Sequence, residues 1–203
     1  MSKKTTHKPA PPARKALPAP ATTALSIRIG HGYDLHRLEP HPPTGHGRPM
    51  IVGGVRLPDP PPGAWREGVG GPVGPVGHSD GDALYHAVTD ALLGALALPD
   101  IGQLFPDTDP RHEGRDSADF VFEAMNRVRA AGYQVVNLDS TVILERPKIG
   151  PHKERIRRNL AALLEVAIEN VNVKGKTHEK VDAVGEGRAI EVHAVLVLMK
   201  AGH

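Results

Sequence analysis

The stretch RIGHGYDLH, residues 28–36, sets the frame for the rest of the chain. Order is expected to begin at Ser26, and the alternation of polar and apolar residues from there onward predicts a β-strand. Residues two apart in a strand point to the same side, so Asp34 and His36 share one face. After a Pro/Gly-rich loop, residues 50–56 (MIVGGVR) predict the partner strand of a hairpin.

Helices and strands alternate along the remainder of the chain. Ser79 and Asp80 are capping candidates for a helix over 83–98, and Gly132 is the expected terminator of a helix over 116–131. Further strands are predicted at 133–144, 171–174 and 189–199, and a further helix at 152–167. The pattern predicts an α+β fold, a single-domain sandwich of a mixed β-sheet with helices on one face.

Residues 1–24 differ in composition from the rest of the chain. They are rich in Pro, Ala, Lys and Thr and contribute +5 to a formal net charge of +2. They predict a disordered N-terminal arm before a domain over 25–203. An organellar transit peptide is the alternative, although the density of proline opposes an amphipathic helix. Residues 58–77 hold many Pro and Gly and predict a flexible insertion within the domain.

The composition excludes several kinds of site and partner. The chain has no cysteine, so a metal must bind to His, Asp or Glu. No run approaches the roughly 18 apolar residues of a membrane span and no secretory signal is recognisable, so a cytoplasmic protein without a membrane partner is expected. The sequence pI of 8.9 reflects the basic arm, and gives no reason to expect nucleic acid as a partner.

One group of residues has the composition of a metal site. Asp34 and His36 lie on one strand face, and His86 inside the next helix could complete the set. Two nitrogens and one carboxylate leave a fourth tetrahedral position open, as in catalytic zinc sites. The spacing alone does not distinguish this from a solvated strand face, because the chain holds 12 histidines.

The segment HSDGD, residues 78–82, lies where this helix is expected to begin. The free backbone N–H groups of a helix N-terminus can bind an anion. The alternative is that Ser79 or Asp80 merely caps the helix and His78 is a loop residue.

Several ordered motifs together resemble one enzyme family. They are RIGHGYDLH (28–36), HSDGD (78–82) with His86, TDALLG (89–94), DIG (100–102), FPDTDP (105–110), Pro147-Lys148, VNVK (171–174), Thr177 and Glu179-Lys180. The chain resembles the 2-C-methyl-D-erythritol 2,4-cyclodiphosphate synthase family of the non-mevalonate route to isoprenoid precursors, over about residues 26–201.

The resemblance implies divalent metal cofactors at two places. Asp34, His36 and His86 would hold a zinc-type ion, and Glu179 would hold magnesium or manganese together with the substrate diphosphate. The enzyme would be a cyclising phosphorus–oxygen lyase that acts on 4-diphosphocytidyl-2-C-methyl-D-erythritol 2-phosphate. The 2-phosphate of the substrate would attack its β-phosphorus and expel CMP.

Such a reaction needs no protein nucleophile, because the attacking phosphate belongs to the substrate. Positioning and charge neutralisation would carry the catalysis. By resemblance, His78 and Thr177 are the catalytic residues that stabilise the transition state, and Ser79 lies beside the phosphate.

The resemblance also implies the residues that contact the substrate. Those matching the loop around the erythritol moiety are Asp100, Ile101, Gly102, Phe105, Asp107, Thr108 and Asp109. Those matching the cytidine pocket are Leu144, Glu145, Arg146, Pro147, Lys148, Ile149 and Gly150. Asp34, His36, His78 and Ser79, together with Lys176, Thr177, His178 and Glu179, complete the implied substrate contacts. Without the resemblance, the Asp-rich loop would be ordinary turn chemistry and Lys148 a surface lysine.

Family members are homotrimers with active sites between subunits, which implies a homotrimer here. Lys176 and Ala183 depart from the family pattern, and residues 185–188 read Gly-Glu-Gly-Arg in place of Gly-Arg-Gly-Glu. If residues 185–188 are extended, Glu186 and Arg188 share one face and are expected to pair between chains at the threefold axis. A non-catalytic, metal-binding trimeric paralogue that acts as a ligand-binding or scaffold protein is the alternative to an enzyme.

Overall fold

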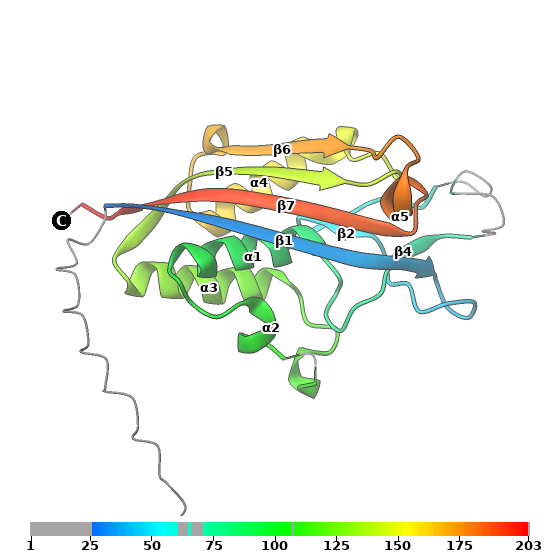
Figure 1. The fold of residues 1–203 in the computed structure, drawn as a ribbon, viewed down its shortest axis with the longest axis horizontal. Coiled ribbons are helices and arrows are strands. Elements are labelled where there is room, and N and C mark those ends of the chain that lie inside the picture. The colour runs from blue at the N-terminus through cyan, green and yellow to red at the C-terminus, as the bar shows by residue number, and fades with distance from the viewer. Residues whose placement is uncertain (1–25, 61–64, 66–70, 107, 203) are drawn as a thin grey trace, which may run out of the picture.

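The computed structural model describes residues 26–60, 65, 71–106 and 108–202. A five-stranded sheet with the order β4-β1-β7-β5-β6 runs lengthwise through the molecule (Figure 1). Its strands are β4 (Val73–Pro75), β1 (Ile27–Pro40), β7 (Ala189–Lys200), β5 (Tyr133–Ile143) and β6 (Val171–Lys176). Only the pair β5 and β6 is parallel, so the predicted mixed sheet is confirmed.

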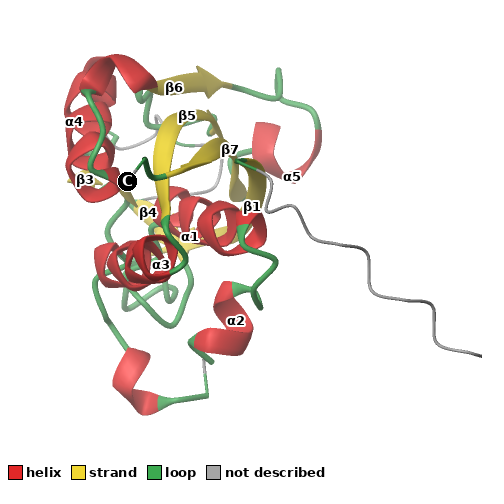
Figure 2. Cartoon of the chain, turned by 90° about the vertical axis from the view of Figure 1, so that its left-hand side faces the viewer, coloured by secondary structure: helices red, strands yellow, loops and turns green. Residues whose placement is uncertain are grey.

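Three helices pack on one face of this sheet (Figure 2). They are α1 (Ala83–Ala95), α3 (Ala118–Ala130) and α4 (Lys153–Leu164), close to the predicted helices. Leu92, Leu160 and Leu196 are fully buried in the core between these helices and the sheet. The sequence pattern does not predict the short helices α2 (Ile101–Leu104) and α5 (Asp182–Gly185). In the described ranges, no helix has the length and hydropathy needed to cross a bilayer.

Helix α1 lies directly on the backbone of β1. A Cβ atom at Gly30 would come within 1.8 Å of the carbonyl oxygen of Ala91, and one at Gly32 within 1.8 Å of that of Ala87. Any side chain at either glycine would therefore push the helix away from the strand. This close approach brings His86, in the first turns of α1, onto the strand face that carries Asp34 and His36.

The opposite face of β1 and β7 carries a row of exposed apolar side chains together with the stacked rings of His31 and His193. Val184 of α5 packs against this face where β7 begins. Side chains alternate along a strand, so the residues between those that meet α1 point the other way. The largest exposed apolar side chains on these two strands are Ile27, Ile29, Tyr33, Leu35, Val195 and Met199, with exposed fractions of 41% to 69%.

The hairpin predicted between the first strand and residues 50–56 is wrong. That segment folds on itself as β2 (Ile51–Val52) and β3 (Val55–Arg56), a separate two-stranded sheet. Gly53 and Gly54 both have positive φ angles, of 58° and 70°, which close the tight turn between the two strands. The partners of β1 are instead β7 and β4.

The interpretation of residues 58–77 as a flexible insertion is wrong for part of that segment. Residues 61–64 and 66–70 lie outside the described residues. The side chain of Trp65 is buried, and its Nε1 donates a hydrogen bond to the carbonyl oxygen of Gly187 at 3.2 Å. Residues 73–75 form β4, which pairs with the end of β1.

The cap of α1 also differs from the prediction. Asp82, not Ser79 or Asp80, is the N-cap, and its fully buried carboxylate accepts from the N–H groups of Leu84 and Tyr85. It also accepts from the N–H groups of Gly53 and Gly54, at 3.0 Å and 2.7 Å, which ties the β2–β3 turn to the helix. Two first-turn N–H groups are therefore already bonded to Asp82 and are not available to an anion.

Candidate functional site

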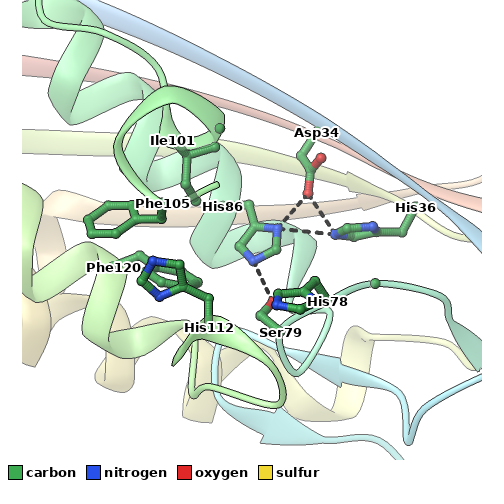
Figure 3. Close-up of a pocket in the computed structure, with 11 residues that line it drawn as sticks. Asp34, His36, His78, Ser79, His86, Ile101, Phe105, His112 and Phe120 are labelled. Atoms are coloured by element: carbon green, nitrogen blue, oxygen red, sulfur yellow. Dashed lines mark hydrogen bonds and ion pairs between the residues drawn. The ribbon is translucent and has the colours of Figure 1, made fainter. Parts of the chain in front are cut away.

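Asp34, His36 and His86 converge at one end of a pocket (Figure 3). Asp34 Oδ2 lies 3.0 Å from His36 Nε2 and 3.1 Å from His86 Nδ1, and the two nitrogens are 3.1 Å apart. Ligands of a tetrahedral zinc at about 2.0–2.1 Å would lie about 3.3–3.4 Å from one another. The three atoms therefore form almost the triangle that a zinc-type ion would require, and they lie at the edge of the pocket.

Asp34 and His86 each stabilise the charged form of the other. Burial favours the neutral form of Asp34, but hydrogen bonds from His36 and His86 outweigh burial and hold the pKa of Asp34 well below its usual range. Burial likewise opposes the charged form of His86, yet the hydrogen bond and the negative charge of Asp34 raise the pKa of His86. The Asp34 carboxylate is therefore ionised, as it must be to bind a cation.

A hydrogen-bond chain behind His86 fixes the orientation of its ring. His86 Nε2 lies 2.9 Å from Ser117 Oγ and 3.0 Å from Ser79 Oγ. Ser117 Oγ donates its proton to Asp80 Oδ1, so its oxygen is left to accept from His86 Nε2–H. Without an ion, Nδ1–H of His86 donates to Asp34. A cation would displace that proton, and the proton held on Nε2 by Ser117 would then leave the Nδ1 lone pair for the cation. Such partners orient metal-binding histidines in many proteins.

Ser117 is fully buried, and we expect its replacement by Ala to weaken zinc binding by about 10- to 100-fold. His86 then loses the one of its two hydroxyl neighbours whose own proton is committed to Asp80, and which must therefore accept from Nε2–H. Competition with a chromophoric chelator measures this affinity. Ser140→Ala is the matched control, since Ser140 is a buried serine whose hydroxyl donates to the carbonyl oxygen of Asn172, away from the donor triangle. Equal zinc affinity in the two variants would contradict the role of Ser117.

The pocket beside the donor triangle has a volume of about 430 Å³. Among the predicted site residues, those that line it are Asp34, His36, His78, Ser79, His86, Ile101, Gly102 and Phe105. His78 Nε2 lies 3.1 Å from the carbonyl oxygen of Asp109, which connects the HSDGD segment to the Asp-rich loop. Gly77, His112 and Phe120 also line the pocket and are missed by the sequence analysis. No local pattern distinguishes these three residues from others of their type.

A second pocket, of about 510 Å³, holds the other half of the predicted site. It lies beyond the ends of β5 and β6. The predicted residues that line it are Leu144, Lys148, Ile149, Gly150, Lys176, Thr177 and Glu179, to which the structure adds Lys153 and Gly175. Lys176, which departs from the family pattern, therefore lies beside Thr177 and Glu179. The two pockets share no lining residue.

The remaining predicted residues that the structure describes lie outside the linings of both pockets. Asp107 is not among the described residues. Asp100 caps α2 by accepting from Gln103 N–H, and Asp109 binds the side chain of Arg111. The others are Thr108, Glu145, Arg146, Pro147 and His178.

The turn after β6 has an unusual backbone. Glu179, Lys180 and Asp182 have positive φ angles of 51°, 62° and 61°, which non-glycine residues rarely adopt. Thr177 Oγ1 donates to Glu179 Oε1 at 3.2 Å, so the two predicted functional side chains are in contact. Backbone strain of this kind is frequent at binding sites, where the surrounding structure maintains it.

The expected extended conformation of residues 185–188 is wrong. Helix α5 ends at Gly185, Glu186 is helical, and Gly187 turns with a φ of 71°. Arg188 pairs with Glu186 of the same chain, at 2.7 Å between Nη2 and Oε2. The tight turn brings the two charges together locally, so the pair does not require a second chain.

Comparison with known proteins was made by sequence and by structure. The profile of the YgbB family matches residues 27–199. A chloroplastic 2-C-methyl-D-erythritol 2,4-cyclodiphosphate synthase of Arabidopsis thaliana is 52% identical over 179 residues, which are 88% of this chain and 70% of that protein. A synthase of the same name from Burkholderia ambifaria is 47% identical over 178 residues, which are 88% of this chain and 99% of that protein.

Solved structures give the same result. IspF of Plasmodium falciparum in complex with CDP superimposes with a TM-score of 0.70 at 34% identity, covering 87% of this chain and 98% of that one. A CDP-bound 2C-methyl-D-erythritol-2,4-cyclodiphosphate synthase gives a TM-score of 0.70 at 39% identity, covering 84% and 99%.

Proposed function

This chain belongs to the YgbB family, and from that membership we propose that it converts 4-diphosphocytidyl-2-C-methyl-D-erythritol 2-phosphate to 2-C-methyl-D-erythritol 2,4-cyclodiphosphate and releases CMP. The observation that carries this proposal is the triangle of Asp34, His36 and His86 at the end of a pocket. A scaffold paralogue is the weaker alternative, because relatives at 47% and 52% identity are named as synthases and the donor set here is complete.

The reaction exchanges one phosphorus–oxygen bond for another. An oxygen of the 2-phosphate bonds to the β-phosphorus, while the bond from that phosphorus to the oxygen bridging to the α-phosphorus breaks. The bridging oxygen keeps the electron pair and leaves as part of CMP. The step is thus a cyclisation by a phosphorus–oxygen lyase, and the chain must bring two anionic groups into line.

The residues of this chain can reduce the repulsion between those groups. Asp34, His36 and His86 would hold a zinc-type ion, and Glu179 a magnesium or manganese ion; when bound, the two cations neutralise phosphate oxygens. His78 and Thr177 would orient the diphosphate by hydrogen bonds to oxygens that gain charge. The loop from Asp100 would hold the erythritol hydroxyls, and residues 144–150 the cytidine.

We propose that the enzyme is a homotrimer whose active sites lie between subunits. Within one chain, β7 and β5 lie between β1, which carries Asp34 and His36, and β6, which leads to Thr177. At the usual strand spacing, β1 and β6 are about 14 Å apart. The metal-side pocket of one chain would therefore meet the Thr177 and Glu179 pocket of a neighbour. The exposed apolar side chains on this face of β1 and β7 form a surface suited to contact between subunits.

Ile29 is 69% exposed on that face, and its replacement by Asp should raise the dissociation constant of the trimer by about tenfold or more, because the interface would bury a charge. Sedimentation at several concentrations measures this. Phe122→Asp is the control, since Phe122 is 54% exposed on α3, away from the open sheet face. An Ile29→Asp protein as firmly trimeric as wild type would exclude this face from the interface.

The decisive experiment for the function is incubation of the purified protein with the proposed substrate and a divalent cation, with quantification of CMP and the cyclic product. The two should form in equal amounts, and both should be lost when a chelator is added. Binding of the substrate without any release of CMP would support the scaffold alternative instead.

Location and organisation belong to the same proposal. We place a single catalytic domain at residues 25–203 and assign residues 1–24 to an arm without a part in catalysis. A cytoplasmic location fits a synthase of bacterial type, whereas the plant relative is named as chloroplastic. Expression of residues 1–24 fused to a fluorescent protein would distinguish the two, because import into an organelle would identify the arm as a transit peptide.

A further inference from the structure

We propose that a basic pocket at the far end of the sandwich binds an organic phosphate. The pocket has a volume of about 490 Å³ and lies where β1 begins and β7 ends, at the left of Figure 1. Its lining residues are Arg28, Leu96, Leu98, Arg127, Ala130, Ala131, Tyr133 and Lys200. None of them lines either half of the proposed active site.

The position of the pocket separates it from the catalytic chemistry. Leu96 follows the last turn of α1, whereas His86 and the cap Asp82 lie at the first turns of that helix. A helix of 13 residues is about 20 Å long. A ligand in this pocket therefore could not touch the donor triangle, and the inference does not depend on the proposed reaction.

The charge of the pocket identifies an anion as its ligand. Arg28, Arg127 and Lys200 bring three positive charges, and no acidic residue is among the described residues that line it. Within the described part of the chain, neither Arg127 nor Lys200 has a side-chain hydrogen bond or ion pair. Guanidinium groups bind carboxylate and phosphate alike through paired N–H donors. A phosphomonoester carries a charge of about −1.5 to −2 and three acceptor oxygens, so it matches two arginines and a lysine better than a singly charged carboxylate does.

One of the three cations is already fixed in place. Arg28 donates from Nε to Tyr133 Oη at 3.1 Å and from Nη1 to the carbonyl oxygen of Ala95 at 3.3 Å. Its guanidinium carbon also lies 5.2 Å from the centre of the Tyr133 ring. These contacts do not involve Nη2, whose N–H groups can donate to a phosphate. Because the Arg28 side chain is already ordered, binding a phosphate there would not require it to be ordered first.

Cations near the ends of α1 and α3 have an alternative explanation, because the C-terminus of a helix attracts positive charge. That attraction accounts for the contact of Arg28 with Ala95, but it does not account for Arg127 and Lys200, whose side chains bind no carbonyl group among the described residues. Of the three cations in this pocket, Arg28 is the one that contacts a helix carbonyl group among the described residues. The pocket therefore keeps an excess of positive charge.

The wall of the pocket indicates that the ligand has an apolar part. Leu96, Leu98 and the ring of Tyr133 line it beside the cations, and Leu98 is 38% exposed. Inorganic phosphate would leave this surface uncovered, whereas an alkyl or aryl phosphomonoester would cover it. The expected ligand is thus a small amphiphilic phosphate, with its charged group on the cations and its apolar group against the leucines.

Isothermal titration of the chelator-treated protein with hexyl phosphate tests the proposal. Wild type should show saturable binding, and the double variant Arg127→Gln/Lys200→Gln should bind at least about tenfold more weakly, since two charged hydrogen-bond donors are lost. Leu98→Ala should weaken hexyl phosphate and leave inorganic phosphate unchanged. Thermal denaturation of each variant verifies that the fold is retained.

The matched control is Arg56→Gln/Arg155→Gln, which removes two exposed positive charges that belong to none of the three pockets described. It should bind hexyl phosphate within about twofold of wild type. An equal loss in both double variants would mean attraction by net charge only and would overturn the proposal, as would the absence of saturable binding. A Leu98→Ala protein that binds both phosphates as wild type does would overturn the amphiphilic class.

Discussion

Purified His86→Ala protein is expected to carry almost no zinc-type ion after dialysis, whereas wild type should carry about one per chain. The substitution removes one corner of the triangle formed with Asp34 and His36. Two remaining ligands bind far more weakly, so the loss should exceed the roughly 10- to 100-fold that removal of a ligand's hydrogen-bond partner causes. Elemental analysis of the dialysed proteins gives the ratio of metal to chain.

The control for this result is His112→Gln. His112 lines the same pocket but does not belong to the donor triangle, so its replacement should leave the metal content near that of wild type. If His86→Ala and wild type hold the same amount of metal, the ion binds elsewhere and the site assignment fails. If both variants lose metal, general damage to the pocket explains the loss.

Glu179→Gln is expected to slow CMP release by on the order of 10²-fold or more, the usual effect of removing one group that stabilises charge in a transition state. The substitution keeps the shape of the side chain but removes the carboxylate that would hold magnesium or manganese at the diphosphate. Glu179 is exposed, so the fold and the zinc-type ion should be retained. Initial rates across a range of magnesium concentrations measure the effect.

Two comparisons make this prediction specific. Glu169→Gln removes a charge from another exposed glutamate, outside both active-site pockets, and should turn over as wild type does. High magnesium should restore part of the lost rate in Glu179→Gln if the carboxylate acts through that ion. Unchanged turnover of the variant at low magnesium would remove Glu179 from the mechanism.

The local periodicity of apolar residues was sufficient to predict the long helices and strands of the fold. The helices and strands predicted beyond residue 82 agree with α1, α3, α4, β5, β6 and β7 to within a few residues. Asp34 and His36 share a strand face as predicted, because alternation along a strand is a local property. The pattern offered His86 as a third ligand, but spacing along the chain favoured a solvated strand face, and it was the resemblance that supported the metal site.

Prediction from the sequence failed where distant segments compete to pair with the same strand. Residues 50–56 read as a partner for β1, but β7, which begins 162 residues after the first residue of β1, takes that place. Pairing over such distances depends on which face of each element is apolar, and a window of neighbouring residues does not contain this information. The capping residue of α1 was missed for a related reason, because the N–H groups of Gly53 and Gly54 select Asp82 only in the folded chain.

The sequence by itself determined the long helices and strands, the family resemblance and the types of side chain at the site. The tertiary structure alone decided which side chains meet. Ser117 reaches His86 across 31 residues of chain, and the glycines of β1 admit α1 closely enough for His86 to complete the donor triangle. It also decided that Thr177 and Glu179 lie in a different pocket from that triangle. These outcomes depend on packing between elements, whose contacts are set by burial and shape across the whole domain and not by any short stretch of residues.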